Sequence, residues 1–475
     1  MAKISLSILL LIALFSGTAT AQEAFKMGLD FDDAGYNSIK KKATLTRSLE
    51  TLPPASSLKQ YAPTPGNQGS HGTCTAWATA YCGKTIVEAI KNNWTDKKTI
   101  NSNAYSPAFL FRLLKPEDLA CNGGSAISTA LGVLKDKGAV PHTSISGLCT
   151  PTITPSQIAV AENAKIKGFM RLFDSNSSEG SRITAVKKSI SEKKPVVFGM
   201  ICPPSFFSAK DVWKPTEEAL ESYGGHAMCV VGYDDSKDGG SFEIQNSWGP
   251  YWGNGGYIWI RYADFGKFVK YAYEFIDLPE PKPADPDLSG QIRMALADGK
   301  AMPANLYTST RGLTVVPAKP AVGPLTLYQA SGNYTAGTRF RIYVSNNEPA
   351  YVYMFSSDAT NVISKIFPYE DNISAALTDK KNNFTIPDED HFIEFDNKPG
   401  KELLCVLYSK NELDMNDVIK QMSLQTGSFN EKIFKVIGTQ TVDPKNIKFS
   451  KDNIGFEAFS NGKGIVPLVV EIEHK

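Results

Sequence analysis

The stretch that most constrains the fold of this chain is a glycine-broken loop, residues 67–72, followed by a cysteine and a helical run. Cys74 opens residues 74–90, which contain no proline and a single glycine. Apolar residues recur there at roughly helical spacing, so we predict a helix that begins at Cys74. A thiol in the first turn of a helix lies among unpaired N–H groups, which lowers its pKa and favours a reactive thiolate. The alternative is a small buried core cysteine, which is the commoner role of a single Cys.

Two later segments supply the groups that a nucleophilic thiol needs. His226 opens an apolar strand after two glycines, and Asn246 follows a second predicted strand, residues 242–245. A thiol nucleophile needs a base to take its proton, and the base needs a third group to fix its tautomer and ring plane. Cys74, His226 and Asn246 are residue types that can fill these three roles.

These segments resemble the motifs of the papain-like cysteine peptidases over residues 52–277. Gln68-Gly69 with Cys74 is similar to the nucleophile motif of that family, Gly-His-Ala to its histidine motif, and Asn-Ser-Trp-Gly to its asparagine motif. The spacing between Cys74 and His226, 152 residues, fits the wide spacing of the family. The resemblance implies a two-lobe fold with a helical left lobe and a β-rich right lobe. It extends to residues 106–110 and 121–124 in the left lobe and to 194–198 in the right.

The resemblance also implies a role for each site residue. Cys74 would attack the peptide carbonyl, His226 would act as base and then acid, and Asn246 would orient the imidazole. The side-chain amide of Gln68 and the backbone N–H of Cys74 would form the oxyanion hole. Trp248 would shield the hydrogen bond between His226 and Asn246 from water. The alternative for Gln68 is an ordinary loop residue.

A pair of glycines, Gly123 and Gly124, is expected to bind substrate. In the family this segment pairs with an extended peptide as an added strand. The alternative is a turn that requires positive φ.

The sequence departs from the family pattern around the nucleophile. His71 and Thr75 stand where the family commonly has Cys and Trp, so the usual disulfide to the Cys-Asn-Gly-Gly segment cannot form. The resemblance instead suggests a bridge between Cys121 and Cys149. Cys74 stays free in this scheme. Buried free thiols are expected at the remaining positions: Cys82, Cys202, Cys229 and Cys405.

The start of the chain indicates export. Residues 1–21 combine a basic start, a short apolar run and a small-residue cleavage site, as a signal peptide does. The apolar run is too short for a stable membrane span, and we find no other candidate span. We therefore expect a secreted or periplasmic protein. Residues 22–51 form a short extension that is too short for the helical inhibitor domain of typical papain-like zymogens, and an ordered arm or a spacer is favoured.

A proline-rich segment, residues 279–288, predicts a stiff linker between two domains. Few contacts are expected to cross it. Short alternating runs within residues 289–475 predict an all-β, sandwich-like domain with one helical piece at 411–422. Parts of this domain resemble a family of uncharacterised domains of exported bacterial enzymes. His391 is expected at the surface rather than in a metal site, and the domain is a candidate for protein or carbohydrate binding.

Composition excludes several other functions. A net charge of +1 and the lack of a basic, aromatic stripe argue against nucleic-acid binding. The chain shows none of the motifs of phosphate-binding proteins, serine hydrolases or zinc peptidases. We expect no cofactor, no metal and a monomeric state.

The sequence thus predicts an α+β protein with a papain-like peptidase domain over residues 52–278. The expected function is an exported thiol endopeptidase that hydrolyses peptides or proteins through a Cys74 thiolate paired with protonated His226. Two alternatives remain: a restricted exopeptidase or acyl transferase on the same fold, and a catalytically silent peptide-binding relative.

Overall fold

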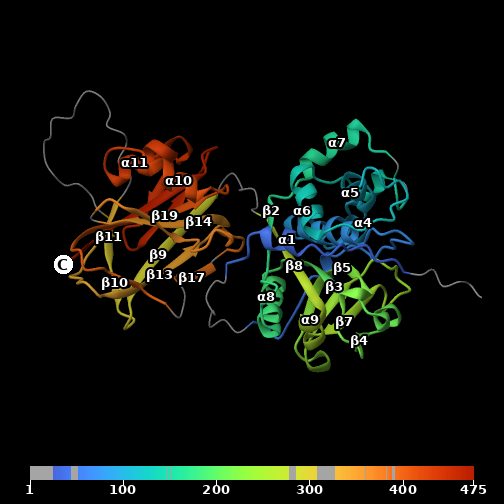
Figure 1. Cartoon of the computed structure of the whole chain (residues 1–475). Coiled ribbons are helices and arrows are strands. Elements are labelled where there is room, and N and C mark those ends of the chain that lie inside the picture. Colours follow the sequence, from blue (N-terminus) through green and yellow to red (C-terminus); the bar gives the residue numbers. More distant parts are fainter. Residues whose placement is uncertain are drawn as a thin grey trace, which may run out of the picture.

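The computed structural model describes residues 25–43, 52–145, 147–150, 152–277, 285–306, 327–358, 360–380, 382–387 and 391–475. These residues form two bodies that lie side by side, with the first body in blue to yellow-green and the C-terminal sheets in yellow to red (Figure 1). The predicted signal peptide, most of the proline-rich linker and one of the short alternating runs, residues 313–316, lie outside the described residues. Among the described residues, no helix combines the length and the apolar character that a membrane span requires.

The first body has a helical lobe above a sheet lobe in the view of Figure 1. The predicted helix at the nucleophile is confirmed: α2 begins at Cys74 and continues without a break through a π-helical segment, η2, into α3. Helix α6 (Ile127–Asp136) ends before Gly138, whose φ of 76° suits glycine. The helices of this body are α1 (Asp33–Ser38), α2 (Cys74–Ala76), η2 (Trp77–Lys84), α3 (Thr85–Lys91), α4 (Lys97–Ser102), α5 (Pro107–Leu114), α6 (Ile127–Asp136), α7 (Pro155–Ala161), α8 (Glu179–Ser191) and α9 (Tyr262–Phe268).

The sheet lobe is built on one mostly antiparallel sheet with the order β2-β8-β3-β5-β6-β7-β4, in which β1 pairs with β5. Strands β3 and β5 are buried along almost their whole length because helices and loops cover both faces. The strands are β1 (Ala55–Ser57), β2 (Gly168–Arg171), β3 (Val196–Ile201), β4 (Val212–Trp213), β5 (Gly225–Asp234), β6 (Ser241–Gln245), β7 (Tyr257–Arg261) and β8 (Val269–Ile276).

The second body contains two sheets that enclose one apolar core, as a sandwich does. One sheet has the order β17-β13-β9-β21-β20, and the other has the order β11-β12-β22-β19-β14-β15. The strands are β9 (Leu288–Leu296), β10 (Ala301–Met302), β11 (Ala304–Leu306), β12 (Leu327–Ala330), β13 (Arg339–Asn346), β14 (Ala350–Ser357), β15 (Ile363–Phe367), β16 (Ala376–Leu377), β17 (Asn382–Ile386), β18 (Ile393–Glu394), β19 (Gly400–Ser409), β20 (Ile447–Phe449), β21 (Ile454–Ala458) and β22 (Ile465–His474).

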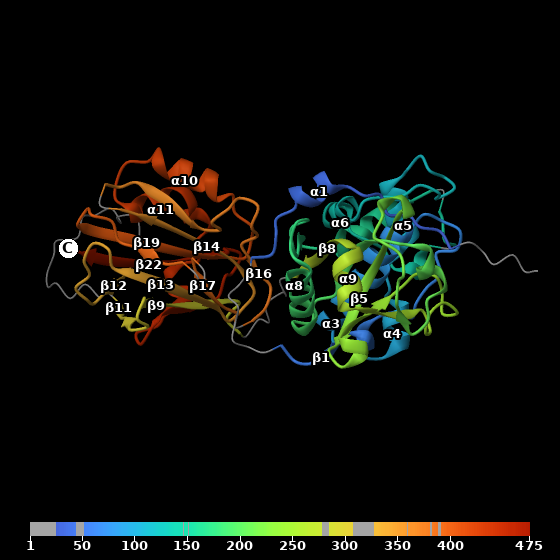
Figure 2. The ribbon, with the colours of Figure 1, turned by 60° about the horizontal axis from the view of Figure 1, so that its bottom comes forward.

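The prediction of a single helix in this second body was wrong. Helix α10 (Met415–Ser423) lies where the helical piece was expected, but a second helix, α11 (Phe429–Ile437), follows it. Both helices cover the outer face of the β14–β19 sheet (Figure 2). A capping box between Ser428 and Glu431 marks the start of α11 in the sequence, and we did not use this signal. The domain is therefore a β-rich sandwich with two helices on one face.

Residues 25–43 form an ordered arm that runs along the first body. Its helix α1 is anchored by Tyr36, whose ring is fully buried and whose hydroxyl donates to the carbonyl of Phe173 at 2.7 Å. The blue segment with α1 lies on the side of the first body that faces the C-terminal domain (Figures 1 and 2). The arm therefore reaches from the first body to the second.

The expectation that few contacts join the two domains was wrong. Met170 in β2 and Ile276 in β8 are buried in one apolar cluster with Tyr351 and Tyr353 of the C-terminal domain. The hydroxyl of Thr378 also donates to Oε1 of Glu274 across the boundary at 3.2 Å. A proline-rich linker limits the path of the chain, but it does not prevent two apolar surfaces from packing beside it.

Candidate active site

The candidate nucleophile, Cys74, occupies the first turn of the continuous helix α2–η2–α3 at the boundary between the two lobes. The loop before it is glycine-rich and its neighbours are small, so the helix start lies against strand β5. The Cys74 side chain is completely buried in this structure.

His226 and Asn246 meet through a short hydrogen bond. His226 opens β5, Asn246 follows β6, and Nε2 of His226 lies 2.7 Å from Oδ1 of Asn246. The same Oδ1 accepts a hydrogen bond from the backbone N–H of Ser247 at 2.7 Å. This second bond fixes the orientation of the Asn246 amide, with its oxygen towards His226. Nε2 must therefore carry the proton, and Nδ1 keeps a lone pair that can accept one.

The lone-pair nitrogen of His226 has no partner among the described residues. Nδ1 is buried and makes no hydrogen bond to any described group, the sulfur of Cys74 included. Burial raises the pKa of the Cys74 thiol to about 11, although backbone hydrogen bonds from Ala227 and Gly28 oppose this shift. Burial also lowers the pKa of His226 to about 4, against the hydrogen bond to Asn246. Thiol and imidazole are therefore both neutral in this closed cleft.

Aromatic side chains enclose the imidazole. The ring of Trp248 stacks on that of His226, with centroids 4.5 Å apart and an interplanar angle of 26°. Phe207 stacks on Trp248 from the body of the domain, and Phe25 stacks on it from the arm, at centroid distances of 5.2 and 4.8 Å. This wall keeps water away from the bond between His226 and Asn246.

Gln68 is held in one orientation by a residue to which the sequence had assigned no role. The hydroxyl of Ser247 donates to Oε1 of Gln68 at 2.7 Å, so the NH₂ group of the amide points the other way. Nε2 donates to two backbone carbonyls, those of Lys26 and His71, both at 2.8 Å. Ser247 belongs to the asparagine motif, but only the fold brings it to Gln68.

The arm passes through the cleft between these groups. Leu29 pairs in parallel with Ser125 on one wall and in antiparallel fashion with Gly225 on the other. The backbone N–H groups of Asp30 and Leu29 donate to the carbonyls of Ser125 and Gly225, at 3.2 and 3.3 Å, and the N–H of Ser125 donates to Gly28 at 3.0 Å. This is strand addition, with the chain's own residues in the cleft.

The predicted glycine pair lies beside the arm. A Cβ on Gly124 would come within 2.2 Å of Oδ1 of Asp30, whereas the N–H of Gly123 donates to the carboxylate of Asp118. Gly124 thus leaves room for an added strand, which pairs one residue further on, at Ser125.

The arm carried a sequence signal that we did not use. Apolar residues alternate through 25–31 as Phe-x-Met-x-Leu-x-Phe, the pattern of an extended segment that buries one face.

The suggested disulfide is confirmed. Cys121 and Cys149 are bridged, with a Cα–Cα distance of 6.0 Å. The other five cysteines are free and buried, which also agrees with the sequence analysis.

Comparison with known proteins matches residues 59–270 to the papain family cysteine proteases and residues 333–412 to a domain of unknown function, DUF4384. An uncharacterized peptidase C1-like protein of Acanthamoeba polyphaga mimivirus is 26% identical over 243 residues, which cover 48% of this chain and 69% of that protein. A cathepsin B-like protein of Giardia intestinalis is 29% identical, over 40% of this chain and 62% of its own length. Mouse cathepsin K is 27% identical, over 42% of this chain and 56% of its own length.

Among solved structures, xylellain from Xylella fastidiosa, a cysteine protease, is similar with a TM-score of 0.42 and 23% identity, over 52% of this chain and 95% of that one. Bromelain from Ananas comosus in complex with the E64 inhibitor has a TM-score of 0.38 and 19% identity, over 47% and 99% of the two chains.

The class that the fold and the site define is the papain-like cysteine peptidases, and residues 59–270 form a domain of that family. The chain joins this domain to a β-rich DUF4384 domain.

Proposed function

We propose that this chain is an exported cysteine peptidase that hydrolyses peptide bonds with Cys74 as the nucleophile. The observation that carries the proposal is the hydrogen bond from Nε2 of His226 to Oδ1 of Asn246. Because Ser247 fixes that oxygen, Nδ1 is left as the basic nitrogen of the imidazole.

The reaction requires the arm to leave the cleft. Once water enters, burial no longer opposes charge, and a proton passes from the Cys74 thiol to Nδ1 of His226 to give a thiolate and an imidazolium. The start of the helix then stabilises the thiolate.

The thiolate attacks the peptide carbonyl, and a bond forms between sulfur and carbon. When the C–N bond breaks, His226 gives its proton to the departing amine, which leaves an acyl-enzyme. A water molecule then gives a proton to His226 and attacks the acyl carbon. The S–C bond breaks, and the carboxylic acid product is released.

Gln68 is suited to bind the oxyanion that forms in each step. Its Nε2 already binds a backbone carbonyl, that of Lys26, at 2.8 Å. We assign the same amide, together with the backbone N–H of Cys74, to the carbonyl oxygen of a substrate.

Two features support export. Residues 1–21 have the composition of a signal peptide, and the disulfide between Cys121 and Cys149 is of a kind that persists in oxidising compartments.

A peptide-library digest tests the proposal. The full chain with Gly28→Ala, a change designed to open the cleft, should cleave library peptides at internal bonds, and the same chain with Cys74→Ala added should not. Removal of single terminal residues would favour the exopeptidase alternative. Equal cleavage by the Cys74→Ala chain would refute the proposed mechanism.

A further inference from the structure

The root of the arm, residues 40–42, lies between the two domains and contacts both. The carbonyl of Lys40 accepts from the N–H of Arg171 in β2 at 3.1 Å, and the N–H of Lys42 donates to the carbonyl of Arg171 at 2.8 Å. Between them, the N–H of Lys41 donates to Asn372 at 2.6 Å, and its carbonyl accepts from the N–H of Ser374 at 2.7 Å. Alternate backbone groups therefore pair with the peptidase domain and with the C-terminal domain, as in the middle strand of a sheet.

The side chain of Lys42 is held in a buried ionic cluster. Its ammonium lies 2.7 Å from Glu192 and 2.7 Å from Glu274, and the Glu274 side chain is 0% exposed. The C-terminal domain closes this cluster: the Thr378 hydroxyl donates to Glu274, and the carboxyl of Asp379 donates to Glu192, since burial and the nearby Glu192 raise the pKa of Asp379 to about 8. Burial opposes charge on Lys42, but the surrounding carboxylates outweigh it and raise the pKa of Lys42.

Removing one member of such a cluster leaves the others buried and unpaired. Breaking a buried ion pair in this way is strongly destabilising, whereas an exposed pair contributes little. An exposed pair lies at the same boundary, between Lys40 and Glu412 at 2.8 Å, with side chains 46% and 41% exposed. The Lys42 cluster is therefore the most deeply buried ionic contact of the arm root, which also carries a partly buried pair between Lys41 and Asp174.

We propose that the C-terminal domain is the lock that keeps the arm in the catalytic cleft. Its segment 372–374 binds Lys41, and Thr378 and Asp379 close the cluster around Lys42, so the domain holds the arm at its root while Phe25 to Leu29 cover the site. Release of the C-terminal domain removes the backbone bonds of Lys41 and opens the Lys42 cluster to water, which leaves the root held by the peptidase domain alone, and the arm then leaves Cys74 more readily. This proposal rests on the proposed function only for its consequence, which is control of peptide hydrolysis.

The experiment measures the rate at which iodoacetamide alkylates Cys74 in the folded full chain. Lys42→Gln on the arm and Asp379→Lys on the C-terminal domain should each raise this rate by about tenfold or more. Lys40→Gln and Glu412→Lys remove and reverse a charge at the exposed pair, so they should change the rate by less than about twofold. Ser374→Pro, which removes the N–H that holds Lys41, should also raise the rate without altering a buried charge.

The outcomes separate the lock from the catalytic proposal. A folded Asp379→Lys chain that reacts at the wild-type rate would overturn the lock. If its thermal transition shows that this variant is unfolded, Ser374→Pro decides in the same way. Faster alkylation with no peptide hydrolysis would leave the lock standing and remove the proposed function.

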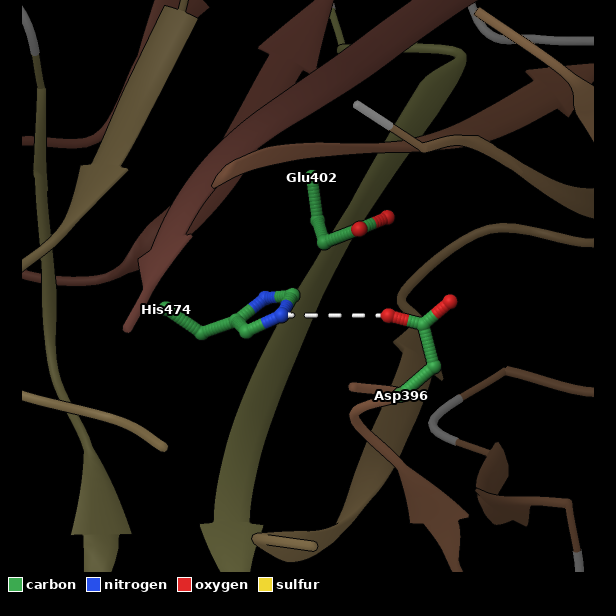
Figure 3. Close-up of side chains that lie close together, drawn as sticks. All are labelled: Asp396, Glu402 and His474. Carbon is green, nitrogen blue, oxygen red and sulfur yellow. Dashed lines mark ion pairs between the residues drawn. The ribbon is translucent and has the colours of Figure 1, made fainter. Parts of the chain in front are cut away.

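A different cluster in the C-terminal domain carries a second inference. His474 in β22 is 1% exposed, and neither ring nitrogen has a hydrogen-bond partner among the described residues. Its Nε2 faces Asp396, with 3.9 Å between Nε2 and Oδ1, and Glu402 in β19 lies on the same side (Figure 3). One ligand atom from each residue lies within 4.8 Å of the others.

The strand register explains the space between these groups. His474 pairs across the sheet with Gly400, which has no side chain, and Glu402 lies two residues further along the same face of β19. Phe395 stacks on His474 with centroids 4.8 Å apart and fixes the ring. Two metal–ligand bonds of about 2.0–2.2 Å each span the 3.9 Å between Nε2 of His474 and Oδ1 of Asp396.

We infer that His474, Asp396 and Glu402 form a site for a divalent transition metal of the zinc type, which prefers imidazole and carboxylate ligands. Zinc chloride added to metal-free full chain with Cys74→Ala, which removes the reactive thiol, should bind with one-to-one stoichiometry by calorimetry and raise the melting temperature. His474→Phe should abolish this binding, and His391→Phe, at an exposed position of the same domain, should not. Absence of zinc binding, or binding that survives His474→Phe, would overturn the inference.

Discussion

Nε2 of Gln68 donates a hydrogen bond to the backbone carbonyl of Lys26 at 2.8 Å. A carbonyl of the chain's own arm thus occupies the amide that we assign to the oxyanion of a substrate. Phe25 stacks on Trp248 one residue before this carbonyl, and Leu29 pairs with both walls three residues after it. A substrate and the arm cannot bind this cleft together, so we expect activity only when the arm has left the cleft.

Gly28→Ala should open the cleft. A Cβ at this position would lie 2.0 Å from the backbone carbonyl oxygen of Gly72, and backbone cannot move aside as a side chain can. Overpacking of this kind costs about 1–3 kcal/mol, so alkylation of Cys74 in the full chain should accelerate by about tenfold. Lys26→Ala is the matched control, since its contact with Gln68 uses the backbone and its side chain makes an exposed hydrogen bond to Asn122, and it should change the rate by less than about twofold. An unchanged rate in the Gly28→Ala chain would mean that the arm does not limit access to Cys74.

The pH dependence of alkylation should differ between the closed and open forms. Burial raises the pKa of Cys74 to about 11 and lowers that of His226 to about 4, so both groups are neutral between these values in the closed form. Alkylation of the full chain should therefore rise about tenfold per pH unit above neutral, because only the thiolate reacts. In the Gly28→Ala chain the ion pair forms, and alkylation should persist below pH 7. Identical profiles for the two chains would contradict the ion pair of the open form.

The lowered pKa of His226 also affects folding stability. Its folded value of about 4 lies below the unfolded value near 6.5, so the unfolded chain binds the extra proton as the pH falls through this window. This contribution to stability is present above about pH 6.5 and is lost towards pH 4. We expect the free energy of unfolding, measured with denaturant, to fall more between pH 7 and pH 5 for the wild type than for a His226→Gln variant. Equal losses would place His226 in contact with water in the closed form.

The catalytic residues should show graded losses once the cleft is open. In the Gly28→Ala chain, His226→Ala should lower kcat/KM by at least about a thousandfold, because nucleophile and base act as a unit. Asn246→Ala should cost less, since the stacked ring of Trp248 still restrains the imidazole. An Asn246→Ala loss as large as that of His226→Ala would show that the amide does more than orient the ring.

Ser247→Ala tests the positioning of Gln68. Without the hydroxyl, Oε1 of Gln68 loses a 2.7 Å hydrogen bond and the amide can rotate. We expect kcat to fall by about tenfold with little change in KM, whereas Gln68→Ala should cost about 100- to 1000-fold. Ser247→Thr keeps the hydroxyl and should restore most of the rate. A purely structural role would lower the melting temperature of Ser247→Ala and leave its kcat unchanged.

The sequence determined the chemistry of the site because short local patterns encode it. A helix beginning at Cys74 follows from the glycine loop and from the helical period after it. The strands that carry His226 and lead to Asn246 follow from their apolar runs. The pairing of Cys121 with Cys149 came from the family resemblance, and the structure confirms it.

Only the tertiary structure showed that the arm occupies the candidate active site and that the two domains pack against each other. The strand pairs of Leu29, the bond from Ser247 to Gln68 and the burial of Lys42 between two domains each join residues more than 90 positions apart. The His474 cluster likewise depends on the register of β19 against β22. No local period encodes such contacts, because they arise when apolar and hydrogen-bonding surfaces of separate segments are buried together.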